Sequence, residues 1–278
     1  MNHYFIFRHF ITRTAALIVA TFMLIGMLGI YALPLVKGAP NVQAKPAGKG
    51  SFKVGASPRR QDKSIKAKMS AEDRQALQEV AVELNKVFIL PQDIYLSVNT
   101  CGVANAFYDP NAKEIIMCTE LVTLFEQAFA KEFKDKQEAA EAADDSTMFV
   151  FFHELGHALI DIYDLPVTGR EEDAVDQLST LIVADGSEEG AASVFNGALA
   201  FTLLDDGEVS ESAFWGEHSM GLQRFYNTIC LLYGQDPKAH KDLVNEEVLP
   251  QARAQRCPSE YQRIEKAWGT LLSPHMKN

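Results

Sequence analysis

The sequence predicts an α+β fold in which a small antiparallel sheet with a hairpin packs on a mostly helical half. Residues 94–98, 105–108 and 114–117 are rich in the apolar, β-branched and aromatic side chains that strands favour. Beyond residue 119, apolar residues recur at intervals of three and four, which is typical of amphipathic helices. Strands early and helices late predict a sheet and a helical half that are separate in the chain but packed together.

The bulk composition is that of an ordinary globular protein, and one sizeable domain is expected. The chain has 278 residues, of which 47% are hydrophobic and 23% are charged. Its formal net charge is −11, and acidic residues concentrate in 132–145 and 171–176. An acidic surface argues against a nucleic-acid partner, because such partners are recognised by clustered Lys and Arg.

The N-terminal residues 1–36 are expected to form a transmembrane helix or a signal segment. Residues 14–36 carry no charged side chain and are long enough to cross a hydrocarbon core of roughly 30 Å. The best cleavage site, at 42–44, lies farther from the apolar run than is usual, so we expect an uncleaved anchor, with secretion after cleavage as the alternative. Residues 37–69 are rich in Pro, Gly, Ala and Lys and predict a flexible linker to a folded domain of residues 70–278.

The four cysteines bear on which side of the membrane the domain lies. Lysines after the apolar run, counted alone, favour the cytoplasm. However, the midpoint between Cys101 and Cys118 falls in the turn signal at 109–111, so the two would face each other across a hairpin, and Cys230 would pair with Cys257 by elimination. Two disulfides require an oxidising compartment, so we expect the domain outside the cytoplasm, periplasmic or extracellular. Four buried free thiols are the alternative.

The helices are expected in the following order. Ser70 is suited to cap a helix whose apolar residues, from Leu77 to Phe88, recur on one face. Residues 119–145 predict one or two helices with an acidic, solvated face. The later helices are predicted over residues 147–162, 169–184, 191–204, 219–233, 243–256 and 259–272.

One segment, His153-Glu154-Leu155-Gly156-His157, has the pattern of a zinc site. Residues four apart share a helix face, so His153 and His157 can direct their imidazoles at one ion while Glu154 reaches a water bound there. The apolar residues on both sides of the motif predict a buried, rigid helix, and Gly156 allows another backbone to approach. The alternative is a pair of hydrogen-bonded core histidines.

A catalytic zinc site keeps one position for water, so a third protein ligand is expected from elsewhere in the chain. Thr168 and Glu171 have the spacing of a capping box, which leaves Glu172 to bind the metal. Asp176 lies four residues on, where it can accept the outward N–H of a metal-bound histidine. Asp173 is the rival third ligand. The alternative for the whole acidic stretch is a solvated helix start.

At these residues the chain resembles the gluzincin metallopeptidases, which combine an HExxH pair with a glutamate in an ExxxD pattern. The matching positions are His153, His157 and the run from Glu172 to Asp176. The resemblance implies a zincin-like domain that binds Zn²⁺ through the two histidines and Glu172.

Two further resemblances extend this one. The segment from Asn105 through Ala106 to Tyr108 is similar to the edge strand with which thermolysin-like enzymes hold a substrate backbone, which implies that Asn105 and Ala106 bind substrate. From about Ser70 to the C-terminus, the chain is also similar to a bacterial family of proposed metallopeptidases catalogued as a domain of unknown function. The matching segments are 101–118, 152–177 and 218–227 with Cys230.

Together these residues predict a zinc-dependent metallopeptidase that acts on a peptide or protein. Glu154 is the expected general base, because it can take a proton from the metal-activated water. A donor to the developing oxyanion is expected to be His218, with Arg224 and Tyr226 as alternatives and a purely structural role beside Trp215 also open. The alternative functions are a non-catalytic, zinc-stabilised envelope binding protein and a metal hydrolase of a non-peptide amide bond.

Overall fold

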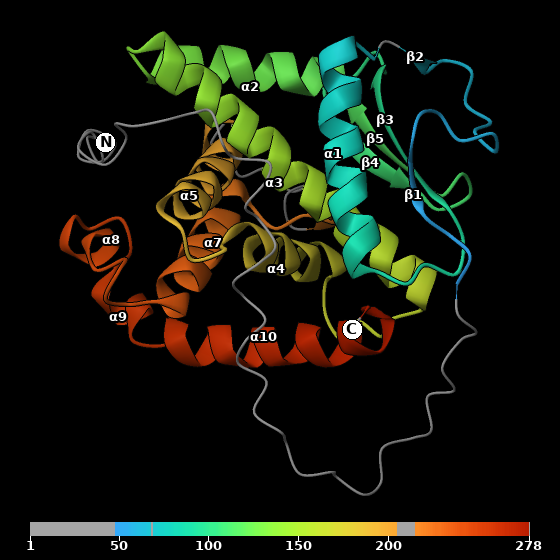
Figure 1. Cartoon of the computed structure of the whole chain (residues 1–278). Coiled ribbons are helices and arrows are strands. Elements are labelled where there is room, and N and C mark those ends of the chain that lie inside the picture. The colour runs from blue at the N-terminus through green and yellow to red at the C-terminus, as the bar shows by residue number, and fades with distance from the viewer. Residues whose placement is uncertain (1–47, 68, 205–214, 278) are drawn as a thin grey trace, which may run out of the picture.

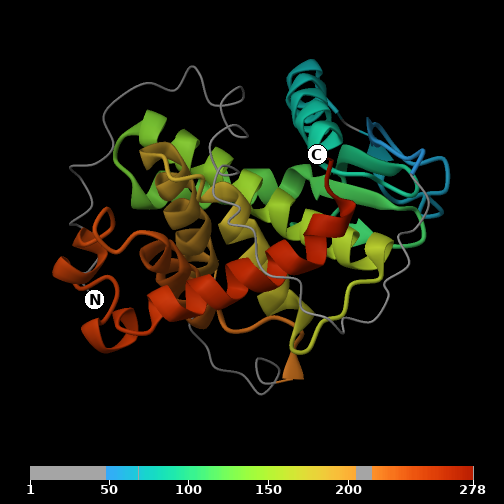
Figure 2. The same ribbon diagram turned by 60° about the horizontal axis from the view of Figure 1, so that its bottom comes forward.

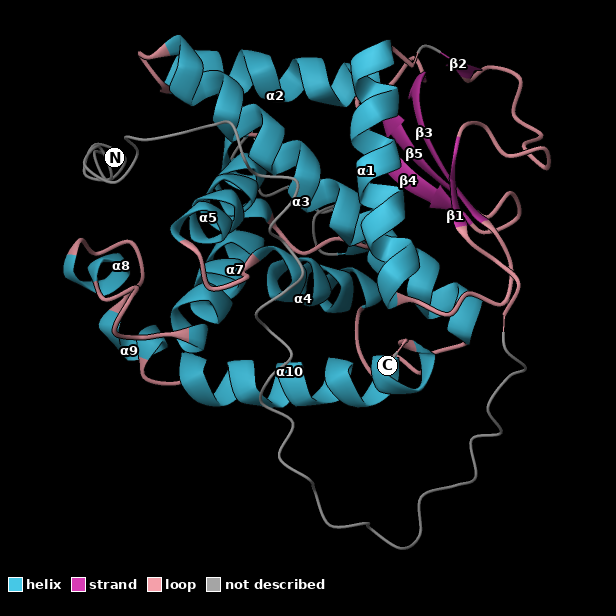
Figure 3. Ribbon diagram, viewed as in Figure 1, coloured by secondary structure: helices cyan, strands magenta, loops and turns pink. Residues whose placement is uncertain are grey.

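The computed structural model describes residues 48–67, 69–204 and 215–277, and it has the expected α+β composition with helix predominating. The sheet occupies one side of the molecule and most helices the other, with α3 (Lys136–Tyr163) running between them (Figure 1). Figure 3 shows the strands confined to that one flank. The predicted segment 1–36 lies outside the described residues. None of the described helices is long and apolar enough to cross a membrane.

The sheet is mixed, so the prediction of a purely antiparallel sheet is wrong. β5 (Glu114–Cys118) lies between β3 (Ile94–Thr100) and β4 (Ala106–Asp109), antiparallel to β4 but parallel to β3. The hairpin at 109–111 is present, but the chain leaves β3, runs back along the edge as β4, and then enters the gap between them as β5. Strand patterns locate strands without specifying their neighbours, which is why this order was not predicted.

The folded part also begins earlier than the sequence predicts. Within the stretch expected to be a flexible linker, β1 (Phe52–Val54) pairs parallel to β3 and β2 (Lys66–Ala67) pairs antiparallel to it. The prediction of a linker over 37–69 is therefore wrong for residues 48–67. These strands are too short to produce a recognisable pattern on their own.

Side chains, rather than strand propensity, hold this early segment in place. Phe52 donates its N–H to the Asn85 side chain at 2.9 Å, and the Asn85 amide donates to the Phe52 carbonyl at 3.0 Å. The buried Arg60 guanidinium forms an ion pair with the fully buried Glu114 and donates to Ser97. Because a buried carboxylate is costly without partners, Glu114 makes the packing of this segment on the sheet specific.

The helices follow the prediction closely. Ser70 caps α1 as expected, in a capping box with Asp73. Two differences were found. α3 begins about three turns earlier than predicted and includes part of the acidic stretch. The single helix predicted at 243–256 is wrong, since Pro250 lacks an N–H and separates two short helices. Apart from α3, the α-helices of the described residues are α1 (Ala71–Val87), α2 (Thr119–Glu132), α4 (Glu171–Val183), α5 (Glu188–Leu203), α7 (Gly221–Gln235), α8 (Asp242–Asn245), α9 (Gln251–Ala254) and α10 (Cys257–Leu272).

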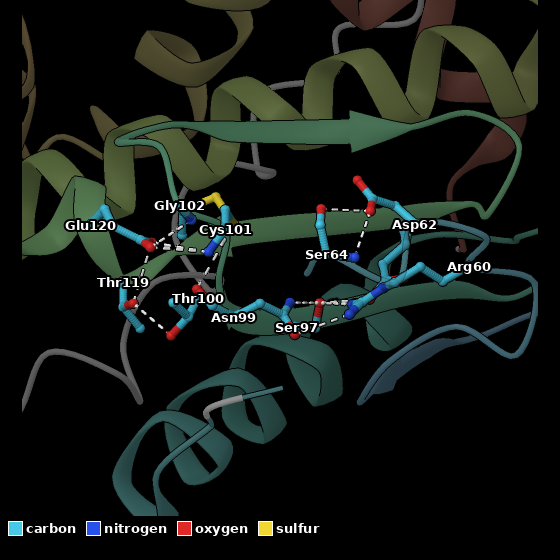
Figure 4. The surroundings of a disulfide bond; sticks show 12 residues. Arg60, Asp62, Ser64, Ser97, Asn99, Thr100, Cys101, Gly102, Thr119 and Glu120 are labelled. Atoms are coloured by element: carbon cyan, nitrogen blue, oxygen red, sulfur yellow. Dashed lines mark hydrogen bonds and ion pairs between the residues drawn. A yellow bond between two sulfur atoms is a disulfide. The ribbon is translucent and has the colours of Figure 1, made fainter. Parts of the chain in front are cut away.

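Both predicted disulfides are present, with Cα–Cα distances of 5.5 Å for Cys101–Cys118 and 5.1 Å for Cys230–Cys257. The first pair forms for a different reason from the one predicted. Cys118 ends β5 and Cys101 follows the parallel strand β3, so the two meet where neighbouring strands end. The Glu120 carboxylate accepts the backbone N–H of Cys101 at 3.1 Å and that of Gly102 at 2.7 Å (Figure 4). The loop that leads into β4 is therefore fixed at its start.

The C-terminal tail returns to the sheet side of the molecule. α10 runs along the helical half and ends near α1, as Figure 2 shows. Ile89 donates its N–H to the His275 carbonyl at 2.8 Å, and Lys277 donates to the Val87 carbonyl at 2.7 Å. The tail therefore links the last helix to the chain that follows α1.

Candidate metal centre

The motif residues lie in the buried part of α3. His153 and Glu154 are 4% and 6% exposed, and His157 is half-buried. α4 crosses close to the motif, because a Cβ at Gly156 would lie only 2.7 Å from the Cβ of Val175. This is the close approach for which the sequence predicted a glycine. It lets α4 present its acidic side chains to both histidines.

Each motif histidine directs its Nδ1 at a carboxylate from α4. His153 Nδ1 lies 2.7 Å from Asp176 Oδ1, and His157 Nδ1 lies 2.7 Å from Glu171 Oε1. Metal-binding histidines commonly use one ring nitrogen for such a carboxylate, which leaves the other for the metal. The contact at Asp176 is the one expected from the sequence, whereas the contact at Glu171 was not foreseen.

The remaining ring nitrogens converge on Glu172. His153 Nε2 lies 3.0 Å and His157 Nε2 3.4 Å from its carboxylate oxygens. His218 Nε2, from the segment before α7, lies 2.8 Å from the same carboxylate. Bonds of roughly 2.0–2.1 Å in a tetrahedral zinc site place ligand atoms about 3.3 Å apart. The distances of 3.0 Å from His153 and 2.8 Å from His218 to Glu172 are close to this spacing, so these three residues fit a zinc ion.

Two overlapping ligand sets share His153 and Glu172. The ligand atoms of His153, Glu172 and His218 lie within 4.8 Å of one another. The set expected from the sequence has His157 in place of His218. The Nε2 of His157 faces the other oxygen of Glu172 at 3.4 Å, but His157 is not a member of the first group. His218 is half exposed, whereas His157 lies on the same rigid helix as His153. The structure thus brings together all four residues that the sequence assigned to the metal or the oxyanion.

Two other sequence-based assignments differ from the observed contacts. α4 starts after Arg170 with no side-chain cap, so the predicted capping box of Thr168 and Glu171 is wrong. Glu171 turns to His157 instead, and nothing in the local sequence signals this contact. Asp173, the rival third ligand, accepts a hydrogen bond from the Ser219 hydroxyl at 2.8 Å and has no recorded contact with the histidines.

Arg224, an alternative oxyanion donor in the sequence analysis, is engaged elsewhere. Its Nε and Nη2 both donate to the Asp176 carboxylate at 2.7 Å, and its guanidinium lies 3.6 Å from the centre of the Phe201 ring. Tyr226, the other alternative, packs edge-on against Phe225. Arg224 therefore supports the carboxylate that orients His153.

The electrostatics of the cluster follow from these contacts. Burial opposes the charged form of His153, but the hydrogen bonds that its ring donates to Asp176 and Glu172 outweigh it and raise the pKa of His153 to about 9. Burial likewise opposes charge on His157, whose pKa is raised by Glu172 and Glu171. Burial favours the neutral form of Glu172, yet the three imidazoles hold its pKa well below the ordinary value. In the absence of metal, the raised pKa values of His153 and His157 favour protonated rings, and a metal cation that binds there would have to displace those protons.

Glu154 lies beside the cluster without joining it. Burial, the largest influence, raises the pKa of this carboxyl, while the imidazoles of His153 and His157 oppose the rise. The backbone N–H of Tyr108 in β4 lies near this carboxyl and makes a smaller contribution that lowers its pKa. A carboxyl with a raised pKa beside a metal site has the properties of a general base that operates near neutral pH.

The proposed substrate strand is the free edge of the sheet. β4 pairs only with β5 among the described strands, and it packs on α3. Cys118 donates its N–H to the Asn105 carbonyl at 3.2 Å, so in the antiparallel alternation the backbone groups of Ala106 point away from β5. The exposed Asn105 side chain precedes this edge.

Comparison with protein-family models gives one match. Residues 56–272 match a family described as "Putative metallopeptidase". The chain belongs to this family. The match begins before α1, which agrees with the early start of the folded part, and it includes all four residues of the histidine–glutamate cluster. No curated protein and no solved structure matches the chain. Membership of this metallopeptidase family supports a metal-dependent hydrolase and leaves its metal and mechanism to be proposed.

Proposed function

We propose that this protein is a zinc metallopeptidase in which His153, His157 and Glu172 hold the metal and Glu154 is the general base. The observation that carries the proposal is the convergence of imidazole nitrogens on the Glu172 carboxylate, with Asp176 and Glu171 occupying the outward Nδ1 atoms. Two core histidines without a metal would not need a third donor between them.

The chemistry requires little motion from the protein. When bound, zinc would lower the pKa of a water from about 15.7 towards 7 and polarise the scissile carbonyl. Glu154 would accept a proton from that water and pass it to the leaving amine. His218 donates its N–H to the developing oxyanion, a contribution of about 3 kcal/mol where such donors have been removed.

The substrate is proposed to bind as an extended strand along β4. The outward backbone groups of Ala106 supply main-chain hydrogen bonds, and the Asn105 side chain supplies a further polar contact. An added strand at this edge lies against α3, so its peptide bonds pass beside the motif. This arrangement favours a peptide or protein over a small non-peptide amide.

The domain is proposed to lie outside the cytoplasm, anchored by the apolar N-terminal segment. The two disulfides support this location, because cytosolic thiols are kept reduced. A protease-accessibility assay on intact and permeabilised cells tests it, and a domain protected in cells whose outer compartment has been opened would contradict it.

The test of the function compares wild type with Glu154→Gln for zinc content and for cleavage of an unbiased peptide library. We expect about one zinc per chain in both and cleavage by wild type alone, because Glu154 does not hold the metal. Chelator should abolish cleavage, and added zinc should restore it. A zinc-loaded wild type that cleaves no peptide would contradict the proposal and would favour a binding protein or a hydrolase of another amide.

A further inference from the structure

A second contact between β4 and α3 lies one turn beyond the metal motif. Asp161 is four residues after His157 and therefore on the same face of α3. Its Oδ2 atom accepts a hydrogen bond from the Tyr108 hydroxyl at 2.6 Å and an ion pair from Lys113 Nζ at 2.5 Å. Tyr108 and Lys113 belong to the β4–β5 hairpin, so a single carboxylate ties both sides of the hairpin to the metal helix.

The environment of this contact makes it stronger than an ordinary surface pair. The Lys113 side chain is only 17% exposed and that of Asp161 34%. Both contacts are charge-assisted, and partial burial reduces their screening by solvent. Lys113 also has a left-handed backbone, with φ of 53°, which directs the chain from the turn into β5.

The same tyrosine contacts the proposed general base through its backbone. Because Asn105 and Cys118 form a hydrogen-bonded pair, the alternation of an antiparallel ladder leaves the N–H of Tyr108 pointing away from β5. That N–H lies near the Glu154 carboxyl, whose pKa it lowers slightly against the larger effect of burial. Tyr108 is thus bound to α3 through its hydroxyl, one turn after His157, and approaches Glu154 with its backbone on the other side of His157.

We propose that Tyr108, Lys113 and Asp161 form a clamp that sets the position of β4 against α3 and thereby holds the Glu154 carboxylate in its working position. The proposal rests on the function proposed above and assigns these three as positioning residues. None of them has a recorded contact with the motif histidines or Glu172, so the clamp acts on the base and leaves the metal ligands alone.

The test uses the full-length, zinc-loaded protein and the variants Tyr108→Phe and Asp161→Asn. Tyr163→Phe is the matched control, because Tyr163 is also on α3 and its hydroxyl donates to the Ile89 carbonyl, away from β4. Three quantities are measured: zinc affinity by chelator competition, kcat and KM on a cleaved library peptide, and the exchange rate of the Tyr108 amide hydrogen.

We expect both clamp variants to keep zinc affinity within about threefold of wild type. The value of kcat should fall at least tenfold while KM changes less than threefold, as for a misplaced base. The Tyr108 amide should exchange at least tenfold faster, and Tyr163→Phe should change neither quantity.

A Tyr108→Phe protein whose kcat and amide exchange both equal those of Tyr163→Phe would overturn the clamp. If wild type cleaves no peptide, the proposed function fails, and the exchange rate still decides whether the clamp holds β4. Tyr108→Phe removes a single oxygen atom, so it carries the test should Asp161→Asn fail to fold.

Discussion

Arg224 donates through Nε and Nη2 to the carboxylate of Asp176, both at 2.7 Å, in a two-point contact between α7 and α4. Asp176 in turn faces Nδ1 of His153 at 2.7 Å. Burial tends to raise the pKa of Asp176, but the hydrogen bonds from Arg224 and His153 outweigh it and lower that pKa. The charge on the carboxylate that orients His153, a proposed metal ligand, therefore depends on an arginine that has no contact with His153 itself.

Arg224→Lys should weaken zinc binding by about tenfold, because an ammonium cannot reproduce the two parallel hydrogen bonds that orient Asp176. Loss of such orienting contacts typically costs 10- to 100-fold in metal affinity. Chelator competition measures the effect. Arg253→Lys is the control, since Arg253 makes a similar two-point contact with Glu260 on α10. Equal zinc affinities in the two variants would contradict the role given to Arg224.

His157→Ala and His218→Ala should separate the two ligand sets. Removal of His157 should cost more zinc affinity than the 10- to 100-fold expected for an orienting contact. Removal of His218 should leave about one zinc per chain and lower kcat by roughly 10²- to 10³-fold, as loss of an oxyanion donor does. Metal analysis and steady-state kinetics measure both effects. If the His218→Ala protein lost its zinc while the His157→Ala protein kept it, His218 would be the metal ligand and His157 would not.

Zinc affinity should rise with pH between about 6 and 9. Below its raised pKa of about 9, His153 is protonated in the metal-free protein, and that proton must leave before Nε2 can bind metal. Each displaced proton makes the apparent affinity change by up to about tenfold per pH unit. Calorimetry in buffers of different ionisation enthalpy measures the proton release directly. An affinity independent of pH across this range would show that the histidines are already neutral.

Gly156→Ala should destabilise the protein by about 1–3 kcal/mol, because the new methyl group would lie 2.7 Å from both the Cβ and the Cγ1 atoms of Val175. Separating α4 from α3 should also weaken zinc binding. Adding Val175→Ala should restore part of the zinc affinity by making room. Gly269→Ala in α10, where a Cβ meets no atom within 4 Å, should instead be neutral or stabilising. Urea denaturation and metal analysis compare the three.

Replacing Cys230 and Cys257 by serine should lower the free energy of unfolding by roughly 3 kcal/mol, because the disulfide closes a long loop in the unfolded chain. The bridge joins α7 to the start of α10. Zinc content at low temperature should therefore stay close to that of wild type. A loss of zinc without a loss of stability would contradict this expectation.

The local sequence predicts the parts of the site that depend on helix periodicity. The two histidines, His153 and His157, are four residues apart, and so are the two carboxylates, Glu172 and Asp176. Residues at this spacing lie on one face of a helix, so the sequence alone predicted that each pair acts together. Contacts between helices distant in sequence carry no such signal. Glu171 looked like a capping residue because its spacing from Thr168 was right, and Arg224 looked like an oxyanion donor because only its chemistry was visible.

The sheet was harder to predict for a related reason. The strands of the hairpin were recognisable from composition, but β5 enters between β3 and β4 because of packing on both faces. The early strands are only two or three residues long and depend on Asn85 and on the buried pair of Arg60 and Glu114. The Cys101–Cys118 pair was predicted correctly from an incorrect arrangement of strands.

Every carboxylate that contacts a motif histidine, whether Glu171, Glu172 or Asp176, comes from less than two turns of α4. α3 alone therefore offers two histidines with nothing to fix their rings. Seating α4 across Gly156 supplies the third ligand and both orienting groups in the same step. Assembly of the proposed metal centre and docking of this one helix are a single event, so a chain caught before that event would lack the third ligand and could not yet cut its neighbours.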